Sequence, residues 1–127
     1  GRQGLVDTLL AHHSARDLAR LYGQDPDQAL EAVHPVARTH DETGEKALYV
    51  CAAFTKRFET WGRADSKALL EYLFEHAVRP EFQARHRWRP GDLVMWDNRC
   101  LLHYAVHDHE DAPRLLHRLQ VRGVVPS

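Results

Sequence analysis

The sequence has few cysteines, no long apolar run and almost no excess charge of either sign. Its two cysteines, Cys51 and Cys100, lie far apart and outside any C-x-x-C spacing, so the sequence predicts neither a disulfide framework nor a cysteine zinc site. We expect both to be small buried apolar residues. No stretch approaches the roughly 18 apolar residues that cross a bilayer, and the first thirty residues lack the pattern of a signal peptide. These absences predict a cytoplasmic protein with no membrane partner.

The charged residues are balanced and dispersed. Seventeen lysines and arginines stand against eighteen aspartates and glutamates, with a formal net charge of -1. Without a basic face to neutralise a row of phosphates, the sequence predicts no nucleic-acid partner. Its 127 residues, 43% of them hydrophobic, are enough for one globular domain at most. Ten histidines are many for a chain of this size and favour metal chemistry without locating it.

Residues 4–33 have the patterns of short helices. An amphipathic pattern begins near the start of this region. Ser14 and Asp17 form a capping box that predicts a helix ending at Gly23. Residues 25–27, Asp-Pro-Asp, are typical of the start of another short helix, which we expect to run through to Val33.

After His34 the pattern changes to a period of two residues. The alternation over residues 35–40, the glycine-containing loop 41–44 and the apolar segment 47–53 together predict a β-hairpin. A helix is then expected from Asp65 or Ser66 to Val78, with an apolar stripe on one face. The remaining residues predict strands at 82–88, 93–96, 100–106 and 115–125, with turns at Pro90-Gly91 and Asp97-Asn98. This order predicts an α+β or mainly β fold with flanking helices.

The densest polar stretch, residues 96–107, contains a histidine within an apolar run. His103 lies between Leu102 and Tyr104, a position that suits a rigidly mounted metal ligand. A buried histidine bonded to a backbone carbonyl fits the same pattern, so both interpretations stay open.

Two arginines follow on the next expected strand. Arg114 and Arg118 are four residues apart, so a strand would place both on one face. A pair of planar guanidiniums suits a carboxylate or a sulfonate. Surface arginines over a solvated face are the alternative interpretation.

Several short motifs of this sequence occur in the order and spacing of one family. They are His34-Pro35-Val36-Ala37-Arg38-Thr39-His40 with Thr43-Gly44, Tyr49-Val50, Phe54-Thr55, Pro80-Glu81-Phe82, Trp88, Pro90-Gly91-Asp92, Trp96-Asp97-Asn98-Arg99, His103-Tyr104-Ala105 and Arg114-x-x-His117-Arg118. Over residues 34–122 the chain resembles the taurine dioxygenase (TauD/TfdA-type) family of non-haem iron(II), 2-oxoglutarate-dependent dioxygenases. Each motif is weak alone, but the ordered series is specific.

This resemblance implies the fold and the reaction. The expected fold is the carboxy-terminal half of a double-stranded β-helix (jelly roll), and residues 1–127 are expected to be the carboxy-terminal part of a single catalytic domain. The implied cofactor is Fe(II) and the implied co-substrate is 2-oxoglutarate. The implied reaction hydroxylates a small anionic substrate, such as taurine or another alkylsulfonate, with O2, and releases succinate and CO2. A homo-oligomer is compatible with the resemblance.

The resemblance also assigns roles to particular residues. His103 matches an iron ligand, Arg114 the arginine that binds the distal carboxylate of 2-oxoglutarate, and Arg118 the arginine that holds the substrate's sulfonate. Phe54 matches an aromatic residue of the substrate pocket, and Trp96 matches a tryptophan near the iron. For these two aromatic residues an ordinary place in the core remains an alternative.

The family's other iron ligands form an H-x-D motif in its amino-terminal half, which we expect to precede this chain. His40-x-Glu42 and His109-x-Asp111 match the motif formally but fall in loops, and we expect neither to bind iron. His103 and His107 would suit zinc only on a helix, whereas their segment predicts a strand. The rival interpretation is a truncated or split-enzyme fragment, inactive alone, that associates with a partner chain through open sheet edges.

Overall fold

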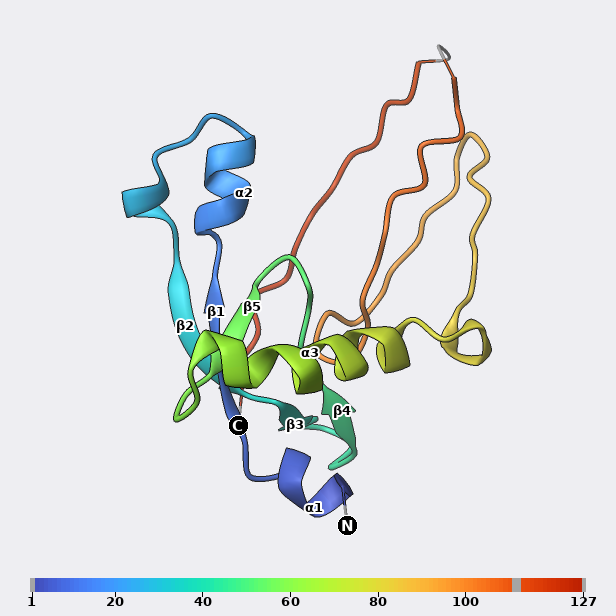
Figure 1. Ribbon diagram of the computed structural model, residues 1–127. Helices are drawn as coiled ribbons and strands as arrows, with labels where there is room; N and C mark the ends of the chain where they lie inside the picture. Colours follow the sequence, from blue (N-terminus) through green and yellow to red (C-terminus); the bar gives the residue numbers. More distant parts are fainter. Residues whose placement is uncertain (1, 111–112, 127) are drawn as a thin grey trace.

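The computed structural model describes residues 2–110 and 113–126 and combines two small sheets with three α-helices (Figure 1). The elements are α1 (Arg2–Val6), β1 (Leu10–Ser14), α2 (Arg16–Leu21), β2 (Glu31–Pro35), β3 (Ala37–Thr39), β4 (Lys46–Leu48), β5 (Thr55–Phe58) and α3 (Arg63–Ala77), with 3-10 turns η1 (Pro26–Gln28) and η2 (Pro80–Phe82). Within this described part, no helix is both long enough and apolar enough to span a membrane.

The first sheet has the strand order β2-β1-β5, with antiparallel neighbours. Ala11 in its central strand is fully buried and lies opposite His34 on one side and Phe58 on the other. The expectation of helices over residues 4–14 and 29–33 is therefore wrong where β1 and β2 lie. Pairing with two neighbouring strands satisfies the backbone of β1, and this tertiary effect overrides a local helical pattern.

The second sheet is the hairpin that the sequence predicts. β3 and β4 pair antiparallel, with Arg38 opposite Ala47. Gly44 closes the loop with a φ of 72°, a left-handed conformation that glycine adopts without strain. The amides of His40 and Gly44 donate across this loop to the carbonyls of Glu45 and His40, each at 2.8 Å. The hairpin loop is therefore a well-bonded tight turn.

Helix α3 packs against β5 and completes the core. Leu70 and Leu73 of the apolar stripe are buried in one cluster with Phe58, as predicted for this helix. The helix begins at Arg63, slightly before the predicted start, because Gly62 is its N-cap residue. Ser66 instead lies in the first turns, where its hydroxyl donates to the carbonyl of Gly62 at 2.8 Å and accepts from the amide of Phe58 at 3.0 Å.

Residues 83–110 and 113–126 contain no strand, so the four strands predicted in this part of the chain are wrong. Figure 1 shows these residues as long excursions away from the sheets and helices. Apolar side chains with strand propensity lie in solvent here, with Leu93 at 90%, Leu119 at 97% and Val121 at 99% exposure. A strand needs a hydrogen-bonded partner, and no neighbouring segment within the described chain supplies one. The predicted turns at Pro90-Gly91 and Asp97-Asn98 are present.

Candidate functional site

The structure places two predicted site residues side by side. The rings of Trp96 and His103 lie 4.9 Å apart between centroids, at an interplanar angle of 45°. The indole Nε1 of Trp96 donates to the side-chain oxygen of Asn98 at 2.9 Å, which fixes the orientation of the ring. His103 is exposed rather than buried, so the interpretation of a buried histidine bonded to a carbonyl is wrong. An exposed imidazole against an oriented indole is available to a ligand.

The other predicted residues lie apart from this pair. Arg114 and Arg118 are exposed in the extended segment 113–126, and no hydrogen bond or ion pair joins either guanidinium to another described residue. Phe54 is 39% exposed in the loop before β5, so it is not an ordinary core aromatic. The structure thus brings together Trp96 and His103, and shows no contact of Arg114, Arg118 or Phe54 with them among the described residues.

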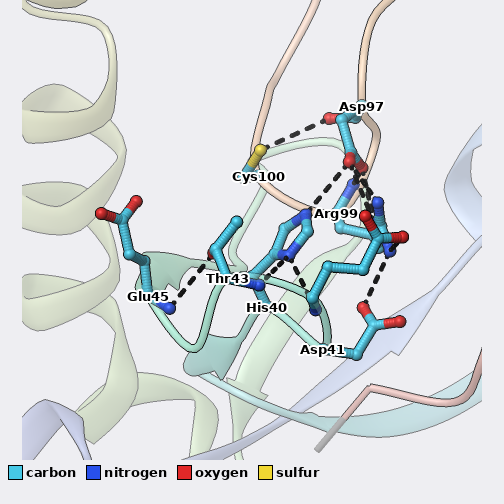
Figure 2. A network of polar contacts seen from close by, with 8 residues as sticks. His40, Asp41, Thr43, Glu45, Asp97, Arg99 and Cys100 are labelled. Atoms are coloured by element: carbon cyan, nitrogen blue, oxygen red, sulfur yellow. Dashed lines mark hydrogen bonds and ion pairs between the residues drawn. The ribbon is translucent and has the colours of Figure 1, made fainter.

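A polar network that the sequence analysis did not anticipate joins the hairpin loop to the turn at residues 97–100 (Figure 2). We call it the inter-loop network, and it consists of His40, Asp41, Glu42, Asp97 and Arg99. Arg99 donates from Nε to both carboxylate oxygens of Asp97 at 3.0 Å and from Nη2 to one of them at 2.7 Å. Its Nη1 donates to the carboxylates of Asp41 and Glu42, each at 3.0 Å. The guanidinium therefore bridges three carboxylates from two loops.

His40 completes the network, and its surroundings fix its tautomer. Its Nδ1 lies 3.2 Å from the backbone amides of Glu42 and Thr43, both of which can only donate. The neutral ring therefore carries its proton on Nε2 and donates it to Asp97 at 3.1 Å. The backbone of the hairpin loop thus orients this imidazole toward Asp97.

These contacts shift the protonation equilibria of the network strongly. Hydrogen bonds from the side chain and the backbone of Arg99, and from His40, hold the pKa of Asp97 far below its usual range. The same pairing, together with Glu42 and Asp41, raises the pKa of Arg99 further above that of a free guanidinium. A backbone hydrogen bond and the Arg99 side chain lower the pKa of Asp41. Asp97, Asp41 and Arg99 are therefore all ionised at neutral pH, with opposite charges in contact.

One group of side chains in the described chain has metal-ligand atoms close together, but it does not fit a cation. The ligand atoms of His40, Asp97 and Cys100 lie within 4.8 Å of one another. His40 presents a proton rather than a lone pair from Nε2, and Arg99 already engages the Asp97 oxygens. The thiol of Cys100 is free and exposed, which corrects the expectation that both cysteines are buried. Cys51 is half-buried.

The Fe(II) implied by the resemblance can be tested against the same residues. His103 fits the requirement for an accessible imidazole ligand. His40 and Glu42, the first formal match to the H-x-D motif, are bonded to Asp97 and Arg99. Asp111 of the other formal match lies outside the described residues. Of the iron ligands that the resemblance implies, His103 therefore lies among the described residues as an exposed imidazole.

Two histidines and a tyrosine lie close together beside the first sheet, and the sequence analysis does not predict this cluster. The rings of His13 and His34 are 5.3 Å apart, and each lies within 6 Å of the Tyr49 ring. Burial, with smaller contributions from His34 and His12, lowers the pKa of His13 to about 4. Burial also lowers the pKa of His34, and the nearby Arg38 adds to this effect. Both rings are neutral at pH 7.

Comparison with known proteins gives these residues a family context. Residues 2–120 match the family model described as "Taurine catabolism dioxygenase TauD, TfdA family". An alpha-ketoglutarate-dependent sulfate ester dioxygenase from Pseudomonas putida is 43% identical over 96 residues, which are 76% of this chain and 32% of that protein. An alpha-ketoglutarate-dependent 2,4-dichlorophenoxyacetate dioxygenase from Cupriavidus pinatubonensis is 42% identical over 122 residues, 91% of this chain and 42% of that protein.

Solved structures agree with this relationship. A taurine dioxygenase from Burkholderia xenovorans superimposes with a TM-score of 0.67 at 39% identity, over 78% of this chain and 32% of that one. AAD-2 in complex with Mn(II) and N-oxalylglycine gives a TM-score of 0.68 at 28% identity, over 78% and 41%. The chain thus spans between about a third and two fifths of the length of these four relatives. With the family model matching nearly all of its residues, the chain belongs to the TauD/TfdA family of alpha-ketoglutarate-dependent dioxygenases.

Proposed function

We propose that this chain is the carboxy-terminal part of the catalytic domain of an Fe(II)- and 2-oxoglutarate-dependent dioxygenase, to which it contributes one metal ligand and two anion-binding arginines. In this proposal His103 binds the iron, Arg114 binds 2-oxoglutarate, Arg118 and Phe54 contact the substrate, and Trp96 lies beside the iron. The observation that carries it is the exposed imidazole of His103 held against Trp96, within a chain whose family is shown.

Each side chain has a physical task in such a site. A neutral imidazole is a good ligand for divalent iron, so His103 would supply one of the side chains that hold it. When bound, Fe(II) supplies the activation of O2 that protein side chains cannot provide. The planar fork of Arg114 would bind the distal carboxylate of 2-oxoglutarate through paired hydrogen bonds and so orient it. Neither arginine is engaged by another described residue, so both guanidiniums are available for anions.

The substrate proposed is a small organic sulfonate or sulfate ester. Two relatives over 40% identical to the chain are named as a sulfate ester dioxygenase and an alkylsulfatase, and a third relative, at 36%, is named as a sulfonate dioxygenase. Arg118 would bind the sulfur oxyanion, because a guanidinium presents donors to two of its oxygens at once. Phe54, partly exposed in its loop, would contact the apolar part of such a substrate.

The test uses a protein that contains residues 1–127 together with the remainder of the family's length, either the native gene product or a hybrid with the Cupriavidus pinatubonensis relative. We call this protein the complete enzyme. Succinate formation is measured with Fe(II), 2-oxoglutarate and one of three substrates: an alkyl sulfate, taurine or 2,4-dichlorophenoxyacetate. The expected result is more succinate with the sulfur oxyanions than with the carboxylate. Turnover with the carboxylate alone would contradict the substrate class, and no turnover with any of them would contradict the reaction.

The 127 residues alone serve as the control. We expect no succinate from them, because one histidine does not hold Fe(II) well against water. Turnover by the isolated chain would contradict this arrangement of ligands.

The exposed apolar side chains of residues 83–110 and 113–126 favour a second role, which is association with another polypeptide. Leu93, Leu119 and Val121 lie in solvent with strand propensity and unpaired backbone, so added strands from a partner chain would bury them. In this case the isolated chain would bind a separately produced remainder of the domain in a pull-down. Failure of the two pieces to associate would contradict this role.

A further inference from the structure

The inter-loop network joins a well-anchored hairpin to a segment without strands. Every side-chain hydrogen bond between the described residues 84–103 and the hairpin loop runs through Asp97 or Arg99. Three contacts carry the connection: His40 to Asp97, and Arg99 to Asp41 and to Glu42. Because no strand pairing holds residues 84–103, these contacts determine where the turn lies.

The hairpin end of this connection is fixed to the core. Val36, immediately before β3, and Val50, just after β4, are both essentially inaccessible to solvent. Arg38 within β3 is only 4% exposed and lies over the Tyr49 ring at 5.2 Å. The loop that joins the two strands of this hairpin therefore has a fixed position, and so do the side chains that it presents to the turn at residues 97–100.

The turn end of the connection is equally well bonded. The carbonyl of Asp97 accepts from the amides of Cys100 and Leu101 at 3.3 and 3.0 Å. Its side chain accepts from the amide of Arg99 at 2.8 Å. Trp96 directly precedes this turn, and His103 follows it after two residues. Fixing Asp97 therefore fixes the backbone from which both rings extend.

We propose that the inter-loop network is a positioning device for the metal ligand, in which Arg99, Asp97 and His40 hold the turn that places His103 against Trp96. This inference rests on the proposed function, in which His103 binds iron. The three residues contact neither substrate nor metal, and they act through the backbone of residues 96–103. Outer residues that orient a ligand typically change metal affinity 10- to 100-fold when they are substituted.

The geometry of Arg99 makes this role specific to a guanidinium. It contacts Asp97 through Nε and Nη2 and the hairpin carboxylates through Nη1, so one planar group spans both loops. A lysine would keep the charge but could not make these contacts from fixed directions.

The experiment measures the dissociation constant of Mn(II) for the complete enzyme by titration of the free ion. We expect Arg99→Gln to raise this constant about tenfold or more. Arg99→Lys should recover only part of the loss. Asp97→Asn tests the other side of the pair and keeps the inference testable if Arg99→Gln does not fold. Arg85→Gln is the matched control, because Arg85 also lies in the strand-free residues 83–110 but pairs with Asp108 rather than with the hairpin.

Two further variants separate positioning from stability and from the proposed function. Leu73→Ala weakens the core and should lower the melting temperature without changing the Mn(II) constant. Suppose that Arg99→Gln lowers the melting temperature but leaves the Mn(II) dissociation constant unchanged, and that His103→Ala raises the Mn(II) dissociation constant. The positioning role is then wrong and the proposed function stands. If His103→Ala leaves Mn(II) binding unchanged, the proposed function is wrong, and this inference falls with it.

Discussion

The two histidines of residues 103–107 differ in their surroundings. His103 lies against Trp96, whose indole is held by Asn98, whereas the ring of His107 faces that of His109 at 6.1 Å. Only His103 therefore has a neighbour that is itself fixed. In the complete enzyme we expect His103→Ala to abolish iron-dependent succinate formation and His107→Ala to leave most of it. Survival of activity without His103, together with its loss without His107, would show that the ligand is the second histidine.

The two arginines can be separated by the molecule that each binds. In the complete enzyme, Arg114→Ala should raise the apparent dissociation constant of 2-oxoglutarate roughly 30-fold or more, since truncating one member of a desolvated charge pair costs about 2–5 kcal/mol. Arg118→Ala should instead raise the KM of the sulfonate or sulfate ester. Anaerobic titration with 2-oxoglutarate, followed by the charge-transfer absorbance of the iron–2-oxoglutarate complex, gives the dissociation constant. Succinate assays at varied substrate concentration give the KM. Unchanged 2-oxoglutarate binding in Arg114→Ala with a large loss in Arg118→Ala would reverse the two roles.

The motifs of the sequence point to individual residues but not to the contacts between them. His40 and the run from Trp96 to Arg99 both belong to motifs, yet nothing in a linear pattern indicates that an imidazole and a carboxylate 57 positions apart form a hydrogen bond. Likewise, His13 and His34 belong to strands whose pairing depends on tertiary structure. The roles of His103, Arg114, Arg118, Phe54 and Trp96 remain predictions.

At the scale of elements, one side chain connects α3 with β5. The hydroxyl of Ser66 is fully buried and accepts the backbone amide of Phe58 at 3.0 Å. In the complete enzyme, Ser66→Ala would leave that amide without a partner in the core, and we expect a loss of about 1–3 kcal/mol in the free energy of unfolding. Urea denaturation measures this loss in the free energy of unfolding. The neighbouring Lys67→Ala, on the exposed face, should change stability by less than about 0.5 kcal/mol. Equal effects of the two variants would contradict this role of Ser66.

Local signals decided which elements could be predicted. The hairpin carries its own turn chemistry at Gly44, and α3 carries a complete apolar stripe with a proline after its end. β1 and β2 carry neither, and they form because three chain segments meet. The four strands predicted between residues 82 and 125 are absent from the described chain, because strand propensity is not enough: a strand also needs a partner, which no single segment encodes.

At the scale of the whole molecule, the half-buried His13 and His34 make stability depend on pH. The pKa of His13 is about 4 in the folded state against 6.5 for an unperturbed histidine, so between these values the unfolded chain binds more protons. The free energy of unfolding should therefore fall as the pH is lowered from about 6.5 to about 4, with little further contribution from His13 below that. The lowered pKa of His34 acts in the same direction.

Denaturation of the complete enzyme at a series of pH values measures this dependence. His13→Gln should flatten the curve between pH 6.5 and 4, because the titrating group is removed. His12→Gln, one residue earlier and on the opposite face of β1, should keep most of the slope. A slope unchanged by His13→Gln would assign the effect to other groups.

The contrast between a packed body and an extended segment also determines how proteases should attack the chain. Trypsin needs an exposed, unpaired stretch of backbone around an arginine or lysine, and Arg87 offers one. Arg38, in a strand and 4% exposed, does not. In a digest of the isolated chain, cleavage should begin near Arg87 and leave a resistant fragment that contains both sheets and α3. Among residues 83–110, Arg99 should be cut late, because carboxylates of the hairpin hold its side chain and it cannot readily enter a protease pocket.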